Sequence, residues 1–336
     1  MDRTWKNKMA IFLMVFMATL MSVGLQFQGT AEAKEKVAYR LKWLFNASVV
    51  GDIYAQAHNI FAARGLDVTV KEGGPERDAI RELEMGRAQF GVASADQVIR
   101  ALNKGAAVLV IAQLFQINPL QWIYRTAQFR INGLEDLKGK KLGVTFGGND
   151  ETILRTLLAK GGITENDVTL FSVRYDYTPF YKRQVNFWPV YRNTQAIILY
   201  DKLQKAGETV AFFNPAEYGI QFVANSVITS PGMIKDHPQT VRRFTKALIQ
   251  GWSEALDPPN HQRALKTLQR FDKDTPLHIL DQQLTATRKL IQPTPEFKIG
   301  TIDVAAWKQT EKIMLDQKQI TRPVFVEKVL RPLGSY

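Results

Sequence analysis

Residues 185–193 read Val-Asn-Phe-Trp-Pro-Val-Tyr-Arg-Asn, so three aromatic rings, an arginine and two amides are grouped around one proline. Pro189 has no backbone N–H and disfavours helical backbone in Trp188, which predicts an extended or turning segment. In that geometry Trp188 and Tyr191 are free to face a cleft, and the stretch is a candidate recognition surface. The alternative interpretation is an ordinary buried strand, because large apolar side chains are more often core than site.

The length and composition of the chain are those of a folded protein with two domains. It has 336 residues, of which 45% are hydrophobic and 23% are charged, whereas one domain typically takes about 150 residues. The net charge of +12 could serve nucleic acid, an anionic membrane or an acidic ligand. Because the charges are dispersed and no run of five basic residues occurs, we interpret them as a solvated surface and expect no nucleic acid partner.

The N-terminus has the pattern of a secretory signal peptide. Residues 3–8 carry three basic side chains, residues 9–25 are mostly apolar without a charge, and Ala-Glu-Ala at 31–33 has the small-x-small pattern of a cleavage site. We expect cleavage after Ala33. Because the apolar run of 17 residues is at the short limit for a membrane span, a retained N-terminal anchor is the alternative. No later segment approaches membrane-spanning length.

The sequence contains no cysteine. An exported chain without cysteine has no disulfide framework and no thiolate for lipid attachment, which predicts a soluble protein in the periplasm. Thiol catalysis and cysteine-ligated zinc or iron sites are excluded. The four histidines, His58, His237, His261 and His278, lack metal-ligand spacing, so we expect no metal site and no cofactor.

Strand and helix patterns alternate in the first third of the chain. Short strand patterns occur at residues 37–41, 67–70, 89–92 and 108–112. Gly65 stands where a left-handed residue would end a helix over 52–64, and Ser94 where a cap would begin a helix up to 105. Such alternation predicts a mainly parallel sheet with helices on its faces. The edge at which such sheets bind ligands would be lined by the loops at 42–46, 72–75 and 93–96.

A second α/β unit is predicted after residue 119. Its first strand ends at Thr-Phe-Gly-Gly-Asn-Asp-Glu, residues 145–151, and a helix follows. Gly147 and Gly148 would let the backbone approach a ligand closely, although a plain turn with a helix cap fits the glycine pair equally well. Further elements are predicted as strands at 168–173 and 209–213, a helix at 194–206, a return to the first lobe at 218–225, and a mostly helical remainder.

Six motifs occur in one order along the chain. They are Leu-Lys-Trp-Leu-x-Asn at 41–46, Ala-x-x-Gly-Leu-Asp-Val at 62–68, Gly-Gly at 73–74, Gly-x-Ala-x-Phe-Gly-Val at 86–92, Leu-Lys-Gly-Lys at 137–140 and Val-x-x-Trp-Pro-Val-Tyr at 185–191. In this order they resemble the periplasmic substrate-binding proteins of ABC importers in the nitrate, sulfonate and taurine class. The chain is most similar to the branch that includes thiamine-pyrimidine precursor binding proteins and synthases.

The resemblance implies an α/β fold of two lobes, of the cluster-two type. Each lobe would be a mainly parallel sheet flanked by helices, with a ligand cleft between the lobes. Residues 1–33 would be the signal peptide, residues 34–121 plus 224–336 the first lobe, and residues 122–223 the second lobe. The implied function is capture of a small planar or anionic molecule, with a thiamine-precursor pyrimidine or a similar heterocycle as the best guess. The protein, expected to be a monomer, would deliver it to an ABC permease in the inner membrane.

The resemblance also implies a set of ligand-binding residues, carried over by position. They are Trp43, Asn46, Ser94 and Asp96 from the first lobe, Gly147, Gly148, Asn149, Asp176, Tyr177, Trp188, Tyr191 and Asn193 from the second, and Tyr218 near the hinge. Aromatic rings would stack on a flat heterocycle, and polar side chains would bind its edge. A core anchor is an equal interpretation of Trp43, and a cap is the alternative for Ser94 and Asp176.

The sequence departs from the pyrimidine-binding pattern at one point of the second lobe. Pyrimidine-binding relatives usually show an acidic residue after the asparagine of this motif, whereas here Asn193 is followed by Thr194 and Gln195. Asn186 likewise stands where an aspartate is common. A carboxylate pairs well with an aminopyrimidine edge, and its loss leaves neutral hydrogen bonding. Another flat heterocycle, such as a flavin fragment, is therefore an open alternative.

Three other interpretations are open. An anion held by Arg174 or Arg192 is an alternative ligand, as in a sulfonate or nitrate binder. A sensor that delivers its bound ligand to a membrane receptor would have the same lobes. Related eukaryotic pyrimidine synthases use histidine and a cysteine-rich segment with iron, whereas this chain has no cysteine, so we do not expect an enzyme.

Overall fold

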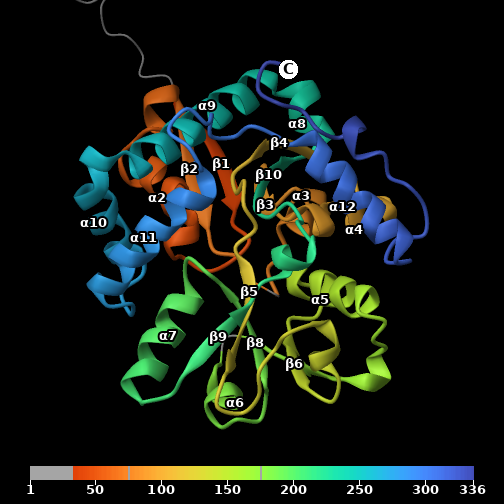
Figure 1. Cartoon of the computed structure of the whole chain (residues 1–336). Helices are drawn as coiled ribbons and strands as arrows, with labels where there is room; N and C mark the ends of the chain where they lie inside the picture. The colour runs from red at the N-terminus through yellow and green to blue at the C-terminus, as the bar shows by residue number, and fades with distance from the viewer. Residues whose placement is uncertain (1–32, 75, 175) are drawn as a thin grey trace, which may run out of the picture. The chain divides into compact units, whose positions relative to one another are not determined.

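The computed structural model describes residues 33–74, 76–174 and 176–336. The predicted signal peptide therefore lies outside the described residues, except for Ala33. Contacts divide the chain into a segment, Met1–Glu35, and a body, Lys36–Tyr336. The ribbon of the body is drawn in Figure 1.

The first sheet combines strands from the beginning of the body with one strand from much later in the chain. It contains β1 (Glu35–Arg40), β2 (Leu66–Lys71), β3 (Phe90–Ala93), β4 (Leu109–Gln113) and β10 (Ser226–Thr229), in the order β2-β1-β3-β10-β4. β1 pairs in parallel with β3, whereas β10 is antiparallel to both β3 and β4. β1, β3 and β4 therefore run in one direction and β10 in the other.

The second sheet is built entirely from the middle of the chain. It contains β5 (Leu120–Arg125), β6 (Lys141–Val144), β7 (Thr169–Ser172), β8 (Phe187–Tyr191) and β9 (Val210–Phe213), in the order β7-β6-β8-β5-β9. β6 is parallel to β7 and β8, and β5 is antiparallel to β8 and β9. Each sheet is therefore mainly parallel with one antiparallel strand (Figure 1).

The predicted fold class, two sheets flanked by helices, is confirmed. The chain leaves the first sheet between β4 and β5 and returns between β9 and β10. β5 and β10 directly follow these crossings, and neither has a counterpart among the predicted strands. The predicted boundaries stay our proposal for the two lobes: residues 34–121 plus 224–336 are termed the first lobe, and residues 122–223 the second lobe.

The helices lie at the predicted places, except for two short ones at residues 178–181 and 231–236 that have no predicted counterpart. The helices are α2 (Val50–Ala57), α3 (Ala79–Glu84), α4 (Ala95–Asn103), α5 (Asn149–Lys160), α6 (Thr178–Tyr181), α7 (Gln195–Lys205), α8 (Pro231–Asp236), α9 (Pro238–Leu256), α10 (His261–Phe271), α11 (Leu277–Ile291) and α12 (Val304–Asp316). The helix predicted over 52–64 is divided into α2 and a short 3-10 turn, Ala62–Arg64, which ends at Gly65 with a φ of 72° as predicted. Ser94 forms the predicted cap of α4.

The stretch 185–193 forms strand β8 and the turn into α7. Pro189 pairs with Trp122 of β5 on one side of β8. On the other side the pairing with β6 is limited to Phe187 opposite Leu142, because Pro189 has no N–H to donate there. The prediction of an extended backbone and the interpretation as a buried strand are both correct for this segment.

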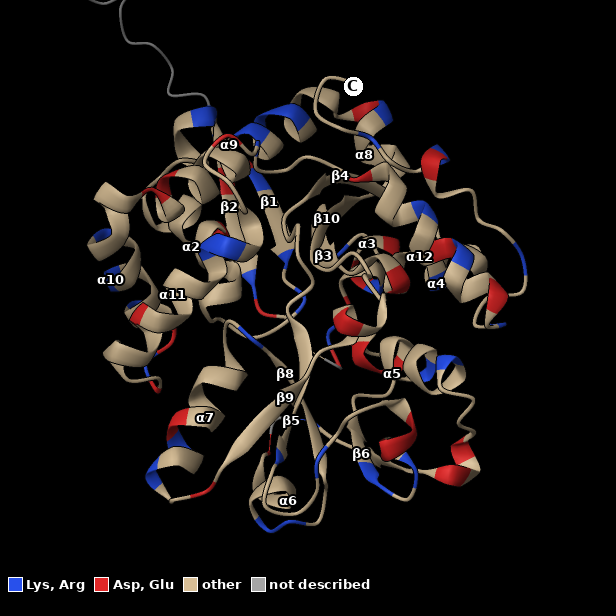
Figure 2. Cartoon of the chain, viewed as in Figure 1, with Lys and Arg blue, Asp and Glu red and all other residues tan. Residues whose placement is uncertain are grey.

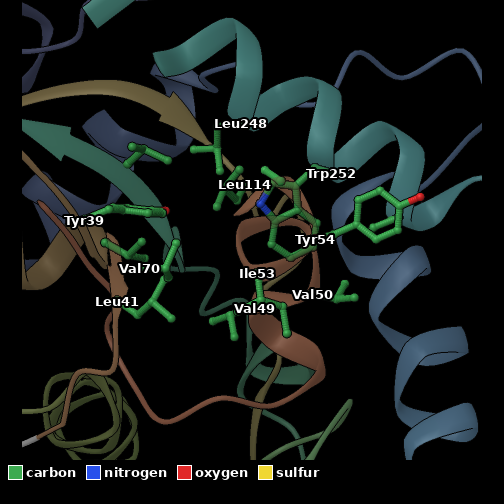
Figure 3. Close-up of a cluster of buried hydrophobic side chains, with 14 of the residues drawn as sticks. Tyr39, Leu41, Val49, Val50, Ile53, Tyr54, Val70, Leu114, Leu248 and Trp252 are labelled. Atoms are coloured by element: carbon green, nitrogen blue, oxygen red, sulfur yellow. The ribbon is translucent and has the colours of Figure 1, made fainter. Parts of the chain in front are cut away.

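The core of the first lobe depends on a close crossing of α2 and α9. Figure 3 shows Trp252 of α9 beside Ile53 and Tyr54 of α2, with Tyr39 of the sheet in the same cluster. A Cβ on Gly51 would lie 2.2 Å from the Trp252 indole. Glycine is therefore required at this position for the two helices to approach.

The charges are dispersed over the described residues, as the sequence indicates. Helices such as α5 and α12 carry both basic and acidic segments (Figure 2). Among the described residues, no helix combines the length and the apolar character needed to cross a membrane.

Candidate functional site

A cavity of about 230 Å³ is lined by residues of both lobes. The first lobe contributes the loop after β1, the end of β3 and the beginnings of α2, α3 and α4. The second lobe contributes residues 145–150 after β6, residues near 173–177 after β7, and β8 with the beginning of α7. These are mostly the carboxyl ends of strands, where open α/β sheets bind their ligands.

Aromatic side chains form much of the cavity wall. Trp43 comes from the first lobe, and Phe146, Tyr177, Trp188 and Tyr191 come from the second. Trp188 is only 1% exposed and its ring centroid lies 5.7 Å from that of Tyr177, so these two rings also belong to the core beneath the cavity. Phe146 is 51% exposed. Such walls favour a flat, apolar ring as the ligand.

Lys42 connects the two lobes inside the cavity. Its Nζ donates to the Tyr191 hydroxyl at 2.9 Å and to Asn149 Oδ1 at 3.0 Å. The Tyr191 hydroxyl in turn donates to Asn149 Oδ1 at 3.3 Å. Bonds to a charged donor are stronger than neutral ones, so this network joins the two lobes across the cavity.

Asp150 is a buried carboxylate in the first turn of α5. Its Oδ2 accepts from the Thr145 backbone N–H at 2.6 Å. Burial raises the pKa of Asp150 to about 6, although hydrogen bonds from Thr145 and the nearby charge of Lys42 act in the opposite direction. The carboxylate therefore organises the turn between β6 and α5.

Eight of the residues predicted for the site line this cavity. They are Trp43, Asn46, Gly147, Gly148, Asn149, Tyr177, Trp188 and Tyr191. Gly147 has a φ of 80°, a conformation that other residues rarely adopt, which explains the first glycine of the pair. A Cβ on Gly148 would lie 2.9 Å from the carbonyl oxygen of Thr145, so the tight turn explains the second.

Asn193 does not line the cavity, contrary to the prediction. It is 0% exposed, and its Nδ2 donates to Ser48 Oγ at 3.0 Å and to Thr287 Oγ1 at 2.9 Å. Both partners belong to the first lobe. Asn193 therefore holds the lobes together behind the cavity wall, because β8 has ended and its side chain turns away from the cavity.

Ser94 and Asp96 are also absent from the cavity wall. Ser94 is buried and forms a capping box with Gln97, which agrees with the alternative interpretation of this residue. Asp96 is 0% exposed in the first turn of α4, with Arg100 Nη2 3.7 Å from its Oδ2. The Ser94 side chain is therefore used by the cap, whereas the two oxygens of Asp96 are buried without a hydrogen-bond partner among the described residues.

Asp176 and Tyr218 lie outside the cavity as well. Asp176 is exposed, and its Oδ1 accepts from the Thr178 backbone N–H at 2.9 Å, which agrees with the alternative that it caps a turn. Tyr218 stacks on Phe213 with ring centroids 5.0 Å apart. Its ring packs against the core that includes Phe213.

The polar side chains of the cavity that were not predicted include Lys42, Gln97, Gln195 and Asn225. Lys42 directly precedes Trp43 in a loop that was expected to line the site, so its position was a usable signal. Gln195 was noted only as a departure from an acidic pattern. Gln97 and Asn225 could not be recognised as cavity residues from the sequence. Gln97 lies in the first turn of a helix and Asn225 in the segment that returns to the first lobe, and neither position has a sequence pattern typical of a ligand-binding residue.

The two arginines weighed as anion ligands lie in different places. Arg174 lines the cavity but forms an ion pair with Glu76 of the first lobe, with Nη1 2.6 Å from Oε1. Arg192 lines a separate cavity of about 250 Å³ near the crossings, where its Nη2 donates to the Asn118 carbonyl at 2.8 Å. Within residues 33–74, 76–174 and 176–336, no group of three or more His, Cys, Asp or Glu side chains could hold a metal ion.

Two mainly parallel sheets and a cavity lined from both lobes define a bilobed ligand-binding fold. The family model described as "NMT1/THI5 like" matches residues 46–262, and the chain belongs to this family.

Two relatives are similar over most of both chains. The riboflavin-binding protein RibY of Chloroflexus aurantiacus is 23% identical over 317 residues, which cover 90% of this chain and 88% of the relative. The formylaminopyrimidine-binding protein of Halalkalibacterium halodurans is 22% identical over 301 residues, 88% of this chain and 89% of the relative. The resemblance found in the motifs is therefore confirmed.

Solved structures have the same fold. The alkanesulfonate-binding protein SsuA of Xanthomonas axonopodis pv. citri, bound to MOPS, has a TM-score of 0.67 at 18% identity and covers 89% of this chain and 98% of its own. The desulfurization enzyme DSZB has a TM-score of 0.58 at 12% identity, with 89% of this chain and 97% of its own covered.

Proposed function

We propose that the protein is the periplasmic substrate-binding component of an ABC importer and captures a flat heterocycle in the cavity between its lobes. The observation that carries the proposal is the Lys42 network, in which a first-lobe cation is bonded to Tyr191 and Asn149 of the second lobe. These three side chains also line the cavity. A ligand that contacts them binds the closed form best, and hinge closure is the motion typical of such proteins.

The nature of the cavity wall supports a heterocycle as the ligand. Five aromatic side chains line it, and rings that stack or meet edge to face contribute about 0.5–1.5 kcal/mol each beyond buried area. One relative is named for riboflavin and another for a formylaminopyrimidine, both of which contain flat nitrogen rings. The ligand class we propose is therefore a pyrimidine or a larger ring system that includes one.

Binding without catalysis fits the polar groups of the cavity. Its carboxylates are Asp78 and Asp150. Asp78 accepts from the Ile80 backbone N–H at the beginning of α3, and Asp150 accepts from the Thr145 backbone N–H in the turn before α5. Groups used in this way position the backbone. A general base, by contrast, would have to reach a proton of the ligand.

The cellular setting follows from the same proposal. The signal peptide of residues 1–33 directs export and is cleaved after Ala33. The protein then acts as a monomer in the periplasm and delivers its ligand to a permease of the inner membrane. Genes for a permease and an ATPase beside this one would support import, whereas a chemoreceptor or a kinase gene would favour the sensor alternative.

The experiment that tests the function is a thermal-shift panel, combined with mass spectrometry of any small molecule that co-purifies. The panel contains pyrimidines, thiamine, flavins, sulfonates and bicarbonate. We expect at least one flat heterocycle to raise the Tm in a saturable way. The proposal fails if no member raises the Tm and nothing co-purifies, and a shift with sulfonates alone would favour the anion-binding alternative.

A further inference from the structure

Amide side chains in the cavity have their carbonyl oxygens occupied by donors of the protein itself. Gln97 Oε1 accepts from the Ser94 backbone N–H at 3.2 Å and from the Ser94 hydroxyl at 3.0 Å. Asn149 Oδ1 accepts from Lys42 Nζ at 3.0 Å. Both amides therefore have their NH2 groups left for another partner.

Gln195 repeats this arrangement on the second lobe. Its Oε1 accepts from the Tyr191 backbone N–H at 3.1 Å and from the Thr194 hydroxyl at 2.7 Å. The Nε2 group has no hydrogen-bond partner among the described residues. A third amide of the cavity thus presents its NH2 group.

The orientation of these amides is fixed by the chemistry of their partners. A backbone N–H and a lysine ammonium can only donate, so the amide oxygen must face them and the NH2 group must point elsewhere. Asn149 is 6% exposed, and its Nδ2 is buried without a partner among the described residues. A buried donor without a partner costs about 1–3 kcal/mol, which a ligand acceptor would recover.

The same cavity also contains acceptors. Asn46, Asp78 and Asp150 each use an oxygen to accept from a backbone N–H group. Asn225 is different: it is 4% exposed, it lines the cavity just before β10, and its Oδ1 is buried without a partner among the described residues. The cavity therefore combines amide donors with acceptors, and among these acceptors Asn225 Oδ1 is buried without a partner in the described part of the chain.

We propose that the cavity selects a dioxo-heterocycle, whose ring edge presents carbonyl oxygens beside an N–H group, over an aminopyrimidine. This inference rests on the proposed function and names the ligand class within it. The carbonyl oxygens accept from the NH2 groups of Asn149 and Gln195, and the ring N–H donates to Asn225. The ring itself lies against the aromatic wall.

The competing ligand classes fit this arrangement less well. An exocyclic amine of an aminopyrimidine would face NH2 groups and leave them unpaired, and a site built to bond a group rejects analogues that lack it. A sulfonate could accept from the donors and from Lys42, but it would leave the aromatic wall and Asn225 without a partner. The donor pattern and the aromatic wall together favour the dioxo ring.

Gln195→Glu is the substitution that tests the proposal. A glutamate still accepts from the Tyr191 backbone N–H, and an acidic residue at the beginning of α7 is favourable for the helix, so the fold is preserved. The change replaces the free NH2 group by an oxygen. Gln204→Glu, an identical change at an exposed position of the same helix, is the matched control.

Affinities are measured by calorimetry for lumichrome, 4-amino-5-hydroxymethyl-2-methylpyrimidine and MOPS. We expect the unmodified protein to bind lumichrome at least about tenfold more tightly than the aminopyrimidine. Gln195→Glu should reduce that ratio at least about tenfold, while Gln204→Glu should leave it unchanged.

The proposal is overturned if the aminopyrimidine binds more tightly than lumichrome, or if Gln195→Glu leaves the ratio unchanged. If MOPS binds and neither heterocycle does, the inference is overturned and the anion-binding alternative to the proposed function is favoured. If none of the three compounds binds and no compound of the wider thermal-shift panel raises the Tm, both the inference and the proposed function are wrong.

Discussion

Lys42 Nζ lies 2.9 Å from the Tyr191 hydroxyl, so a first-lobe cation and a second-lobe phenol are hydrogen-bonded within the cavity. Tyr191→Phe keeps the ring and removes the hydroxyl. Because a hydrogen bond to a charged group contributes about 1.5–3 kcal/mol, we expect ligand affinity to fall about 10- to 100-fold with little change in the stability of the free protein. Calorimetry with the ligand found in the panel measures the loss.

Tyr200→Phe is the control for this prediction, because Tyr200 is 46% exposed on α7 and does not line the cavity. Equal affinities for Tyr191→Phe and Tyr200→Phe would mean that the network with Lys42 has no part in ligand binding.

Trp188 has two roles that the sequence could not separate, since it lines the cavity and is 1% exposed in the core of the second lobe. Trp188→Ala should therefore lower the free energy of unfolding by about 3–5 kcal/mol as well as weaken binding. Urea denaturation of the free protein measures the first effect. Stability within about 0.5 kcal/mol of the unmodified protein, as expected for an exposed residue, would contradict this placement.

Asn193 contacts the first lobe without lining the cavity. Its Nδ2 donates to Ser48 and Thr287, so Asn193→Ala should weaken the closed form and lower ligand affinity by about 3- to 30-fold. X-ray scattering at saturating ligand should still show closure, because the ligand's own contacts remain. Asn132→Ala, at an exposed position of the second lobe, is the control, and an unchanged affinity for Asn193→Ala would exclude a role in closure.

The buried carboxyl group of Asp52 should make the free energy of unfolding depend on pH. It is 1% exposed, burial raises its pKa to about 7, and the Tyr39 hydroxyl donates to its Oδ1 at 2.5 Å. The folded pKa lies above the unfolded one, so the folded state holds the proton more tightly. The stabilising contribution is complete below about pH 4 and is lost as the pH rises through about 7.

The comparison with Asp52→Asn isolates this effect. Between pH 4.5 and pH 8 the unmodified protein should lose roughly 2–4 kcal/mol of unfolding free energy relative to the variant. Urea denaturation at both pH values gives the difference. A constant difference between the two proteins would show that Asp52 does not titrate in this range.

Features with local causes were predictable from the sequence. Gly65 ends its turn with a left-handed backbone, and Ser94 caps its helix with Gln97 three residues later. The motif order identified the family, and with it the two mainly parallel sheets. Most of the aromatic wall followed from the same motifs, because Trp43 and Tyr191 come directly after or within strands.

Features that depend on distant partners were not predictable. Asn193 was placed in the site because nothing in its neighbourhood shows that Ser48 and Thr287, far away in the sequence, lie beside it. The donor character of Gln195 depends on how its carbonyl group is held, which a residue type alone does not specify. Strand β10 pairs with β3, with Ser226 opposite Ala93 from a distant part of the sequence, so residues 226–229 were not predicted as a strand.

The central claim is that a flat heterocycle binds between the lobes and is held where Lys42 meets Tyr191. Native mass spectrometry of the purified protein with lumichrome tests it most directly, in parallel with the Tyr191→Phe and Tyr200→Phe variants. The account predicts a complex of one protein and one ligand that persists in Tyr200→Phe and is strongly reduced in Tyr191→Phe. A complex of equal abundance in both variants, or no heterocycle complex with any of the three proteins, would contradict it.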